Sequence, residues 1–185
     1  MDLEGAVNLR DEFLRLCATP SDIQNHLPRF VDLVTLLDAK HVIELGSRSG
    51  VSTVAWLYAL GGTGGRLTSV DLDPAPNIGQ HEHWTHIQGD DLDPDIIAGL
   101  EPADIVFIDT SHLYEHTVQE LNIYRWLVRP GGVLVLHDTM LPIPEGAPAR
   151  PLYPVRKAVE EFTAENGYVW HNYPDSWGLA VIKVV

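Results

Sequence analysis

The stretch HVIELGSRSG, residues 41–50, runs from a short apolar segment into a loop that carries two glycines. Residues 41–45 have the pattern of a buried strand, and the loop leads into a helix predicted from about Val51 to Leu60. Further apolar runs predict strands at 66–72, 84–88, 103–109, 132–138, 168–171 and 178–185, with helices between several of them. Continuous apolar strands separated by helices indicate a parallel sheet that is covered on both faces.

The end and the beginning of the chain complete this prediction. Only a short polar turn, 174–176, separates the last two strands, so we expect them to pair antiparallel at one edge of the sheet. The fold class is therefore α/β, a doubly wound, Rossmann-like, seven-stranded mixed sheet whose last strand is antiparallel. We expect one domain over residues 1–185, with a cofactor-binding core at 41–185. The segment 1–40 predicts two helices, one over 2–17 and one after Pro20, capped by Ser21 or Asp22 and kinked or broken at Pro28.

The composition argues against several classes of function. Lys and Arg total 12 against 26 Asp and Glu, which gives a formal net charge of −14. Such a surface repels nucleic-acid phosphates and anionic lipid. The single cysteine, Cys17, leaves no internal disulfide and no cysteine-rich zinc site. No signal core and no stretch of roughly 18 apolar residues is present, so we expect a cytoplasmic protein. Its apolar N-terminal helices are compatible with a homodimer.

Three strand ends carry residues suited to binding a nucleoside cofactor. Ligands of open α/β sheets bind beyond the carboxyl ends of the strands, where glycine lets the backbone approach the ligand. Gly46 and Gly50 lie in the first such loop, before a helix N-terminus with free N–H groups. Asp71 ends the second strand and could accept hydrogen bonds from both hydroxyls of a ribose. Gly89 and Asp90 end the third strand, where an adenine edge would lie.

The fourth and fifth strands end in acidic and imidazole side chains. Asp109 ends one strand and His137-Asp138 ends the next, so a parallel sheet brings them to the same rim. Two carboxylates and an imidazole could hold a divalent metal, although histidine suits Mn²⁺, Fe²⁺ or Zn²⁺ better than Mg²⁺. Alternatively, His137 points into the sheet and the carboxylates bind backbone or cofactor without a metal. His112 could accept a hydroxyl proton near neutral pH, or could merely cap the helix that it opens.

Together these motifs resemble class I S-adenosylmethionine-dependent methyltransferases. Arg48 stands where many members have a glycine. The pattern Ile-Asp-x-x-His-x-Tyr at 108–114, followed by Pro-Gly-Gly at 130–132, is similar to a subgroup with metal-dependent O-methyltransferases of sugars and natural products and with cephalosporin-hydroxylase-like proteins. That subgroup typically has two acidic or amide ligands where this chain has His137-Asp138. The resemblance implies a cofactor site formed by Glu44, Gly46, Ser47, Gly50, Ser52, Asp71, Leu72, Gly89, Asp90 and Asp109.

The resemblance implies that the protein methylates a hydroxyl of a small-molecule acceptor with S-adenosylmethionine. Asp109, His137 and Asp138 would hold a divalent metal, Mg or Mn, and His112 with Asp109 would be the catalytic residues. An NAD(P)-binding oxidoreductase is one alternative, but its Gly-x-Gly-x-x-Gly fingerprint is replaced here by Gly-x-x-x-Gly. A non-catalytic cofactor-binding domain that partners a biosynthetic enzyme is the other. The proline-rich loop from Met140 to Pro154 is expected to overhang the site.

Overall fold

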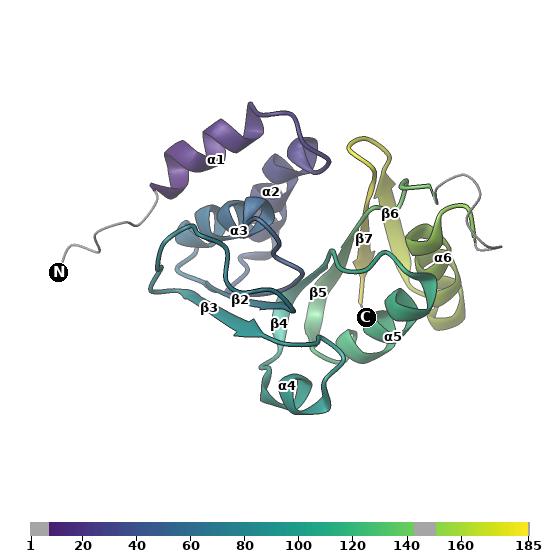
Figure 1. The fold of residues 1–185 in the computed structure, drawn as a ribbon. Coiled ribbons are helices and arrows are strands. Elements are labelled where there is room, and N and C mark those ends of the chain that lie inside the picture. The colour runs from purple at the N-terminus through teal and green to yellow at the C-terminus, as the bar shows by residue number, and fades with distance from the viewer. Residues whose placement is uncertain (1–7, 143–150, 185) are drawn as a thin grey trace.

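The computed structural model describes residues 8–142 and 151–184 as one seven-stranded sheet flanked by helices (Figure 1). The strand order is β3-β2-β1-β4-β5-β7-β6. The strands are β1 (His41–Leu45), β2 (Arg66–Asp71), β3 (Trp84–Gln88), β4 (Ala103–Ile108), β5 (Val128–His137), β6 (Val169–Tyr173) and β7 (Leu179–Lys183). The helices are α1 (Leu9–Cys17), the 3₁₀ turn η1 (Gln24–His26), α2 (Leu27–Leu37), α3 (Val51–Gly61), α4 (Pro94–Gly99), α5 (Tyr114–Tyr124) and α6 (Pro154–Asn166).

The strand directions confirm the predicted mixed sheet. β1 to β5 are mutually parallel, and β7 runs antiparallel to both β5 and β6. Several predicted boundaries were wrong. β5 begins at Val128 instead of Gly132, because pairing with Ala103 continues past an irregularity in the register. Helix α4 was not predicted. None of the helices in the described part of the chain is long and apolar enough to cross a membrane.

The N-terminal segment differs from its prediction at Pro28. Helix α2 begins at Leu27, so neither Ser21 nor Asp22 caps it, and Pro28 lies in its first turn. A first-turn proline is tolerated because its missing N–H would have no intrahelical partner there. Pro28 therefore neither kinks nor breaks the helix. Helix α1 starts at Leu9, and the predicted part at 2–7 lies outside the described residues.

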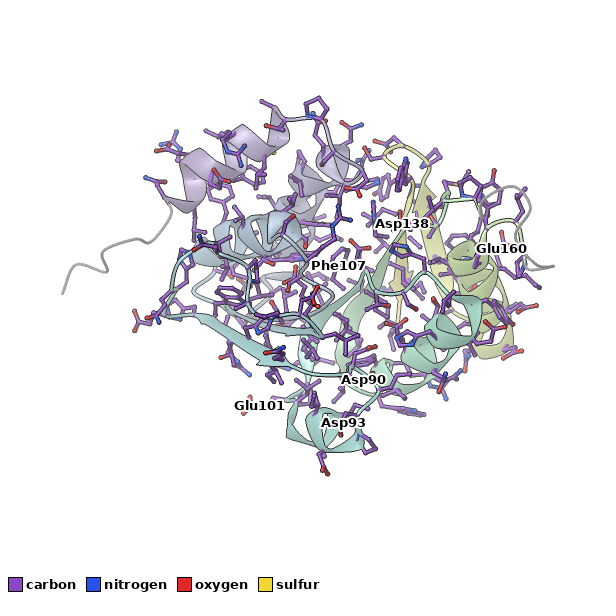
Figure 2. The ribbon with its side chains drawn as sticks, viewed as in Figure 1. Asp90, Asp93, Glu101, Phe107, Asp138 and Glu160 are labelled. Carbon is purple, nitrogen blue, oxygen red and sulfur yellow. The ribbon has the colours of Figure 1, made fainter. Side chains whose placement is uncertain are left out.

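Alternating side chains of the central strands give the sheet two apolar faces. Val42, Ile105 and Phe107 pack with α1, α2 and α3, whereas their strand neighbours Ile43 and Val106 pack with α4, α5 and α6 on the other face. On the first face the Phe30 ring stacks on Trp56 at 4.0 Å and meets Phe107 edge-on at 5.1 Å (Figure 2 labels Phe107). The prediction of helices on both faces is thereby confirmed.

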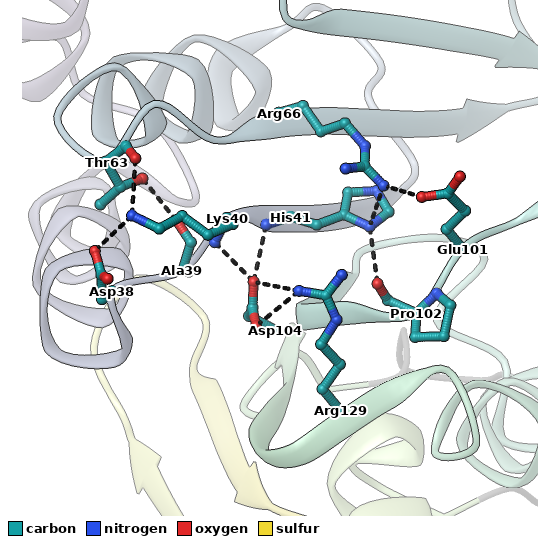
Figure 3. A network of polar contacts seen from close by, with 10 residues as sticks. All are labelled: Asp38, Ala39, Lys40, His41, Thr63, Arg66, Glu101, Pro102, Asp104 and Arg129. Carbon is teal, nitrogen blue, oxygen red and sulfur yellow. Dashed lines mark hydrogen bonds and ion pairs between the residues drawn. The ribbon is translucent and has the colours of Figure 1, made fainter.

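A polar network ties the starts of the parallel strands together (Figure 3). Asp104 Oδ2 accepts hydrogen bonds from the backbone N–H groups of Lys40 at 2.7 Å and His41 at 2.9 Å. The Arg129 guanidinium lies 3.4 Å from both Asp104 oxygens. The buried His41 ring contacts the Pro102 carbonyl and the Thr68 hydroxyl. These contacts join β1, β2, β4 and β5 at the edge opposite the functional loops.

Gly46 brings the loop after β1 against the end of β4. Its N–H donates to the Val70 carbonyl, and Asp109 N–H donates to the Leu45 carbonyl, so the ladders continue beyond the strands. Gly46 has a φ of +84°, and a Cβ at this position would lie 2.1 Å from the Asp109 carbonyl oxygen. Real Cβ atoms do not approach an oxygen so closely. Only glycine permits this contact.

Gly46→Ala is expected to lower the free energy of unfolding by about 2–5 kcal/mol, because it adds a clash to the cost of a left-handed alanine. Gly64→Ala is the matched control, since Gly64 has a φ of +68° but nothing within 4 Å of the added Cβ. The control should lose only about 1–2 kcal/mol. Chemical denaturation of both variants measures the difference, and equal losses would contradict the close-contact argument.

Candidate functional site

Two neighbouring cavities lie at the carboxyl edge of the sheet. The larger, of about 490 Å³, is lined by the end of β2, the loops after β1, β2, β3 and β4, and His116 of α5. The smaller, of about 80 Å³, is lined by the loop after β1, the start of α3, Asp22 and Ile23, and His112. The two cavities adjoin, because four residues line both of them: Gly46, Arg48, Asp109 and Thr110.

Asp71 holds the loop after β1 in place. Its Oδ2 accepts hydrogen bonds from Ser47 N–H at 2.6 Å, Ser47 Oγ at 3.1 Å and Arg48 N–H at 2.9 Å. Its Oδ1 accepts one, from Asp73 N–H at 2.9 Å. Burial opposes ionisation, but these hydrogen bonds outweigh it and lower the pKa of Asp71 below its usual value. The carboxylate is therefore ionised at neutral pH, and Oδ1 keeps accepting capacity toward the larger cavity.

Glu44 supports the loop from inside the core. It is fully buried and lines neither cavity, and its Oε2 accepts hydrogen bonds from Ser69 Oγ at 2.6 Å and Thr53 Oγ1 at 2.9 Å. Burial raises the pKa of Glu44 to about 7. Ser52 does line the smaller cavity. The structure thus places Glu44 beneath the site that the sequence assigned to it, where it can position α3 and β2.

Asp109, His112, His137 and Asp138 converge beside the smaller cavity. His112 Nε2 lies 2.7 Å from Asp138 Oδ2 and 3.2 Å from Asp109 Oδ1. His137 Nδ1 lies 3.3 Å and 3.6 Å from the same two oxygens. Figure 2 shows Asp138 near the upper ends of β5 and β7. The structure therefore brings together the four residues predicted for catalysis and metal binding, and it draws His137 toward the carboxylates.

The four groups form a nearly neutral cluster. Burial opposes protonation of both imidazoles, but hydrogen bonds to Asp109 and Asp138 outweigh it and raise the pKa of His112 to about 9 and that of His137 to about 10. Despite burial, the same contacts hold the pKa of Asp109 well below its usual value and also lower that of Asp138. At neutral pH two imidazolium cations thus balance two carboxylates. In this state His112 carries a proton and cannot act as a base.

The β6–β7 turn orients His137. The Nε2 atom of His137 donates to the Ser176 carbonyl at 3.0 Å, and this bond directs Nδ1 to the two carboxylates. The buried His26 ring packs edge-on against His137 at 5.7 Å, and burial lowers the pKa of His26 to about 4. Trp177 lies in the same turn with a φ of +61° and half of its surface exposed. The turn and the N-terminal segment therefore both support the cluster.

A second cluster, Asp91, His116 and Glu120, lies at the wall of the larger cavity and was missed from the sequence. His116 Nε2 is 3.2 Å from each Asp91 oxygen, and Glu120 Oε1 accepts a hydrogen bond from Thr110 Oγ1 at 2.7 Å. Glu120 is fully buried against Asp91. Burial, with the repulsion from Asp91, raises the pKa of Glu120 to about 9. An acid on the inner face of a predicted helix was the available signal.

The remaining predicted cofactor residues line the larger cavity, namely Leu72, Gly89 and Asp90, while Ser47 lines the smaller one. Gly50 is the N-cap residue of α3, has a φ of +85° and packs against Pro76 and Ile78. Asp22 and Ile23 were not predicted to line the site. They come from the segment before α2, whose place over the loop follows from long-range packing.

Glu120→Gln tests the protonated state of the buried acid. Between about pH 4.5 and 9 the folded protein holds a proton on Glu120 that the unfolded chain releases, so the unfolding free energy of the wild type should fall with rising pH relative to Glu120→Gln. Below pH 4.5 the difference should be constant. Denaturation across this range measures it, with Glu115→Gln, exposed on the same helix, as control. Parallel pH profiles for all three proteins would contradict the assignment.

The comparisons with known proteins place this geometry. Solved structures that this chain resembles include three that are 17–20% identical to it. The O-methyltransferase from Bacillus cereus in complex with SAH is 17% identical, with a TM-score of 0.67 over 99% of this chain and 93% of that one. TomG from Streptomyces achromogenes, an O-methyltransferase in complex with SAM, is 20% identical, with a TM-score of 0.66 over 97% and 90%. MycE, of the mycinamycin pathway, in complex with Mg, SAH and mycinamycin VI, is 19% identical, with a TM-score of 0.73 over 96% and 55%.

These likenesses concern the fold, and no curated protein matches the sequence. A family described as a methyltransferase domain matches residues 43–139, more than half of the chain. The match begins in β1 and ends just after Asp138, so it contains the glycine loop after β1 and the cluster of Asp109, His112, His137 and Asp138. The chain belongs to this methyltransferase-domain family and has the class I S-adenosylmethionine-dependent methyltransferase fold.

Proposed function

We propose that this methyltransferase domain transfers the methyl group of S-adenosylmethionine to a hydroxyl oxygen of a small molecule, with a divalent cation at Asp109, His137 and Asp138. The contact of Gly46 with the Asp109 backbone carries the proposal. It joins the loop expected to hold the cofactor to the cluster expected to hold the acceptor. The family match favours this function over the NAD(P)-binding alternative.

The larger cavity supports the cofactor assignment. Its volume of about 490 Å³ lies within the range usual for small-molecule and cofactor sites. Among the described residues, Asp71 Oδ1 accepts a hydrogen bond from the Asp73 N–H alone, which leaves it able to accept another from a ribose hydroxyl. Gly89 and Asp90 line the same cavity at the end of β3. These features fit the ribose and the adenine of the cofactor, respectively.

The cluster of Asp109, His137 and Asp138 fits a divalent cation. Asp109, His137 and Asp138 each offer a ligand atom, and these atoms lie within 4.8 Å of one another. Asp138 Oδ1 is buried and has no hydrogen-bond partner among the described residues, so a cation would satisfy it. The bond from His137 Nε2 to Ser176 leaves Nδ1 as the ligating atom once it loses its proton. Two carboxylates and an imidazole suit Mn²⁺ or Fe²⁺ better than Mg²⁺. MycE, which holds Mg with SAH, supports a metal in this fold.

The chain's own groups position the acceptor and its proton. Bound S-adenosylmethionine would supply an electrophilic methyl group, and a cation would stabilise the ionised hydroxyl. Asp109 and Asp138 would hold the cation, and with their charge thus engaged His112 would lose the contacts that raise its pKa. His112 could then accept the hydroxyl proton as the oxygen bonds to the methyl carbon and the carbon–sulfur bond breaks. Alignment of the acceptor oxygen with the methyl group lowers the remaining barrier to transfer.

Asp71→Asn should weaken S-adenosylhomocysteine binding at least about tenfold while the protein stays folded, because the amide keeps an acceptor for the loop but loses the charge that a ribose hydroxyl would meet. Asp73→Asn is the matched control, since Asp73 is exposed and lines the same cavity. Calorimetric titration measures the affinities. Equal affinity in wild type and Asp71→Asn would contradict the ribose assignment.

Mn²⁺ should bind the wild type, and Asp138→Asn should weaken that binding at least about tenfold because one carboxylate ligand becomes a neutral amide. Asp95→Asn, exposed on α4, is the control and should bind Mn²⁺ normally.

Chelation should abolish methyl transfer to a panel of catechols and glycosides, measured as released S-adenosylhomocysteine, without weakening cofactor binding. Full transfer in excess chelator would remove the metal from the proposal and leave O-methylation standing.

A further inference from the structure

Arg48 has an unusual place in this site. It is the only Lys or Arg among the described residues that line the two cavities. The larger cavity is lined by Asp71, Asp73, Asp90 and Asp91, and the smaller one by Asp22, with Asp109 shared. An anionic group of a ligand would be repelled from almost all of this surface. Among the described residues that line these cavities, Arg48 is the one permanently cationic side chain that could receive it.

The backbone at Arg48 is held in a conformation that favours glycine. Its φ is +43°, and its N–H is fixed to Asp71 Oδ2 at 2.9 Å. The loop has glycine at 46 and 50, where positive φ angles are needed, yet residue 48 carries a long side chain. A left-handed residue with a Cβ is disfavoured, and such positions concentrate at ligand sites. A long side chain kept at such a position points to a role for that side chain.

The guanidinium of Arg48 is largely free to bind a ligand. Its side chain is 81% exposed, and its contact with a described side chain is one long ion pair, from NH1 to Asp22 Oδ2 at 3.5 Å. Asp22 lines the smaller cavity, so the guanidinium lies at that cavity's rim. A guanidinium has five N–H donors and binds a carboxylate with two of them at once. The single contact with Asp22 leaves the guanidinium able to form such a two-bond pair with a carboxylate.

The smaller cavity also offers backbone donors beside Arg48. Val51 and Ser52 line it, and their N–H groups belong to the first turn of α3, where no intrahelical partner exists. No side chain in the described part of the chain caps this helix, and its first turn contains no acidic residue. The cavity volume of about 80 Å³ suits the end of a ligand and not a nucleoside. A nucleoside in the larger cavity would direct its 5′ substituent past Gly46 into this space.

We infer that Arg48 binds the carboxylate of a ligand at the smaller cavity, and that this carboxylate belongs to the amino-acid end of the methyl donor. The inference rests on the proposed function and adds to it a specificity-determining residue. Arg48 would exchange its long contact with Asp22 for a bidentate pair with the ligand. The site would then distinguish a nucleoside that carries an amino-acid chain from one that does not.

The test compares two compounds that share adenosine and a thioether. S-Adenosylhomocysteine carries the amino-acid end, whereas 5′-methylthioadenosine lacks it. Arg48→Gln should weaken S-adenosylhomocysteine binding about five- to tenfold and change 5′-methylthioadenosine binding less than twofold in calorimetric titrations. Arg48→Lys should lie between the two, because it keeps the charge without the planar pair of donors. Arg15→Gln, on the exposed face of α1, is the matched control and should behave as wild type.

Ionic strength provides a second readout. The preference of the wild type for S-adenosylhomocysteine should decline between low and high salt, and that of Arg48→Gln should not, since only the first contains an exposed ion pair. Equal weakening of both compounds in Arg48→Gln would show a structural role for Arg48 and overturn the inference. Unchanged affinity for both would overturn it as well and would leave an acceptor carboxylate as the ligand to examine. A wild type that binds neither compound would overturn the proposed function and this inference together.

Discussion

The contact between Gly46 and the Asp109 backbone is the constraint on which the site depends. A Cβ at residue 46 would lie 2.1 Å from the Asp109 carbonyl oxygen, so the loop after β1 and the end of β4 can touch only through glycine. Asp71 then holds the rest of that loop through three hydrogen bonds. At the opposite edge, Asp104 joins the strand starts. The loops that carry chemistry are thus mounted on a sheet fixed at its far end.

The sequence was sufficient for the sheet because strand residues buried on both faces form continuous apolar runs. The seven strands, the antiparallel pair and the convergence of Asp109, His112, His137 and Asp138 followed from these runs and from strand ends meeting at one rim. Pro28 was misjudged, because a proline in the first turn looks the same in sequence as one that interrupts a helix. Glu44 was placed in the cofactor site by resemblance, whereas in the structure it is buried beneath the site and accepts hydrogen bonds from Thr53 of α3 and Ser69 of β2.

Buried charge in this protein is handled by pairing rather than by exclusion. Two imidazoles and two carboxylates balance one another beside the smaller cavity, and a carboxyl group that keeps its proton, Glu120, lies against Asp91 beside the larger one. An uncompensated charge at either place would be costly.

Residues with strained backbone also concentrate around the two cavities. Of the six non-glycine residues with positive φ in the described part of the chain, Arg48, His112 and Asp138 belong to the site itself.

Two more of the six, Ser176 and Trp177, lie with Gly178 in the β6–β7 turn, whose Ser176 carbonyl accepts the Nε2 proton of His137. This hairpin tip is remote in sequence from β5, yet it selects which nitrogen of a candidate ligand faces the carboxylates. A loop graft at the tip would therefore change the orientation of an imidazole about forty positions earlier in the chain. In chimeras of such domains, the β6–β7 hairpin and the end of β5 should therefore come from the same parent. A junction between them would separate His137 from the Ser176 carbonyl that orients it.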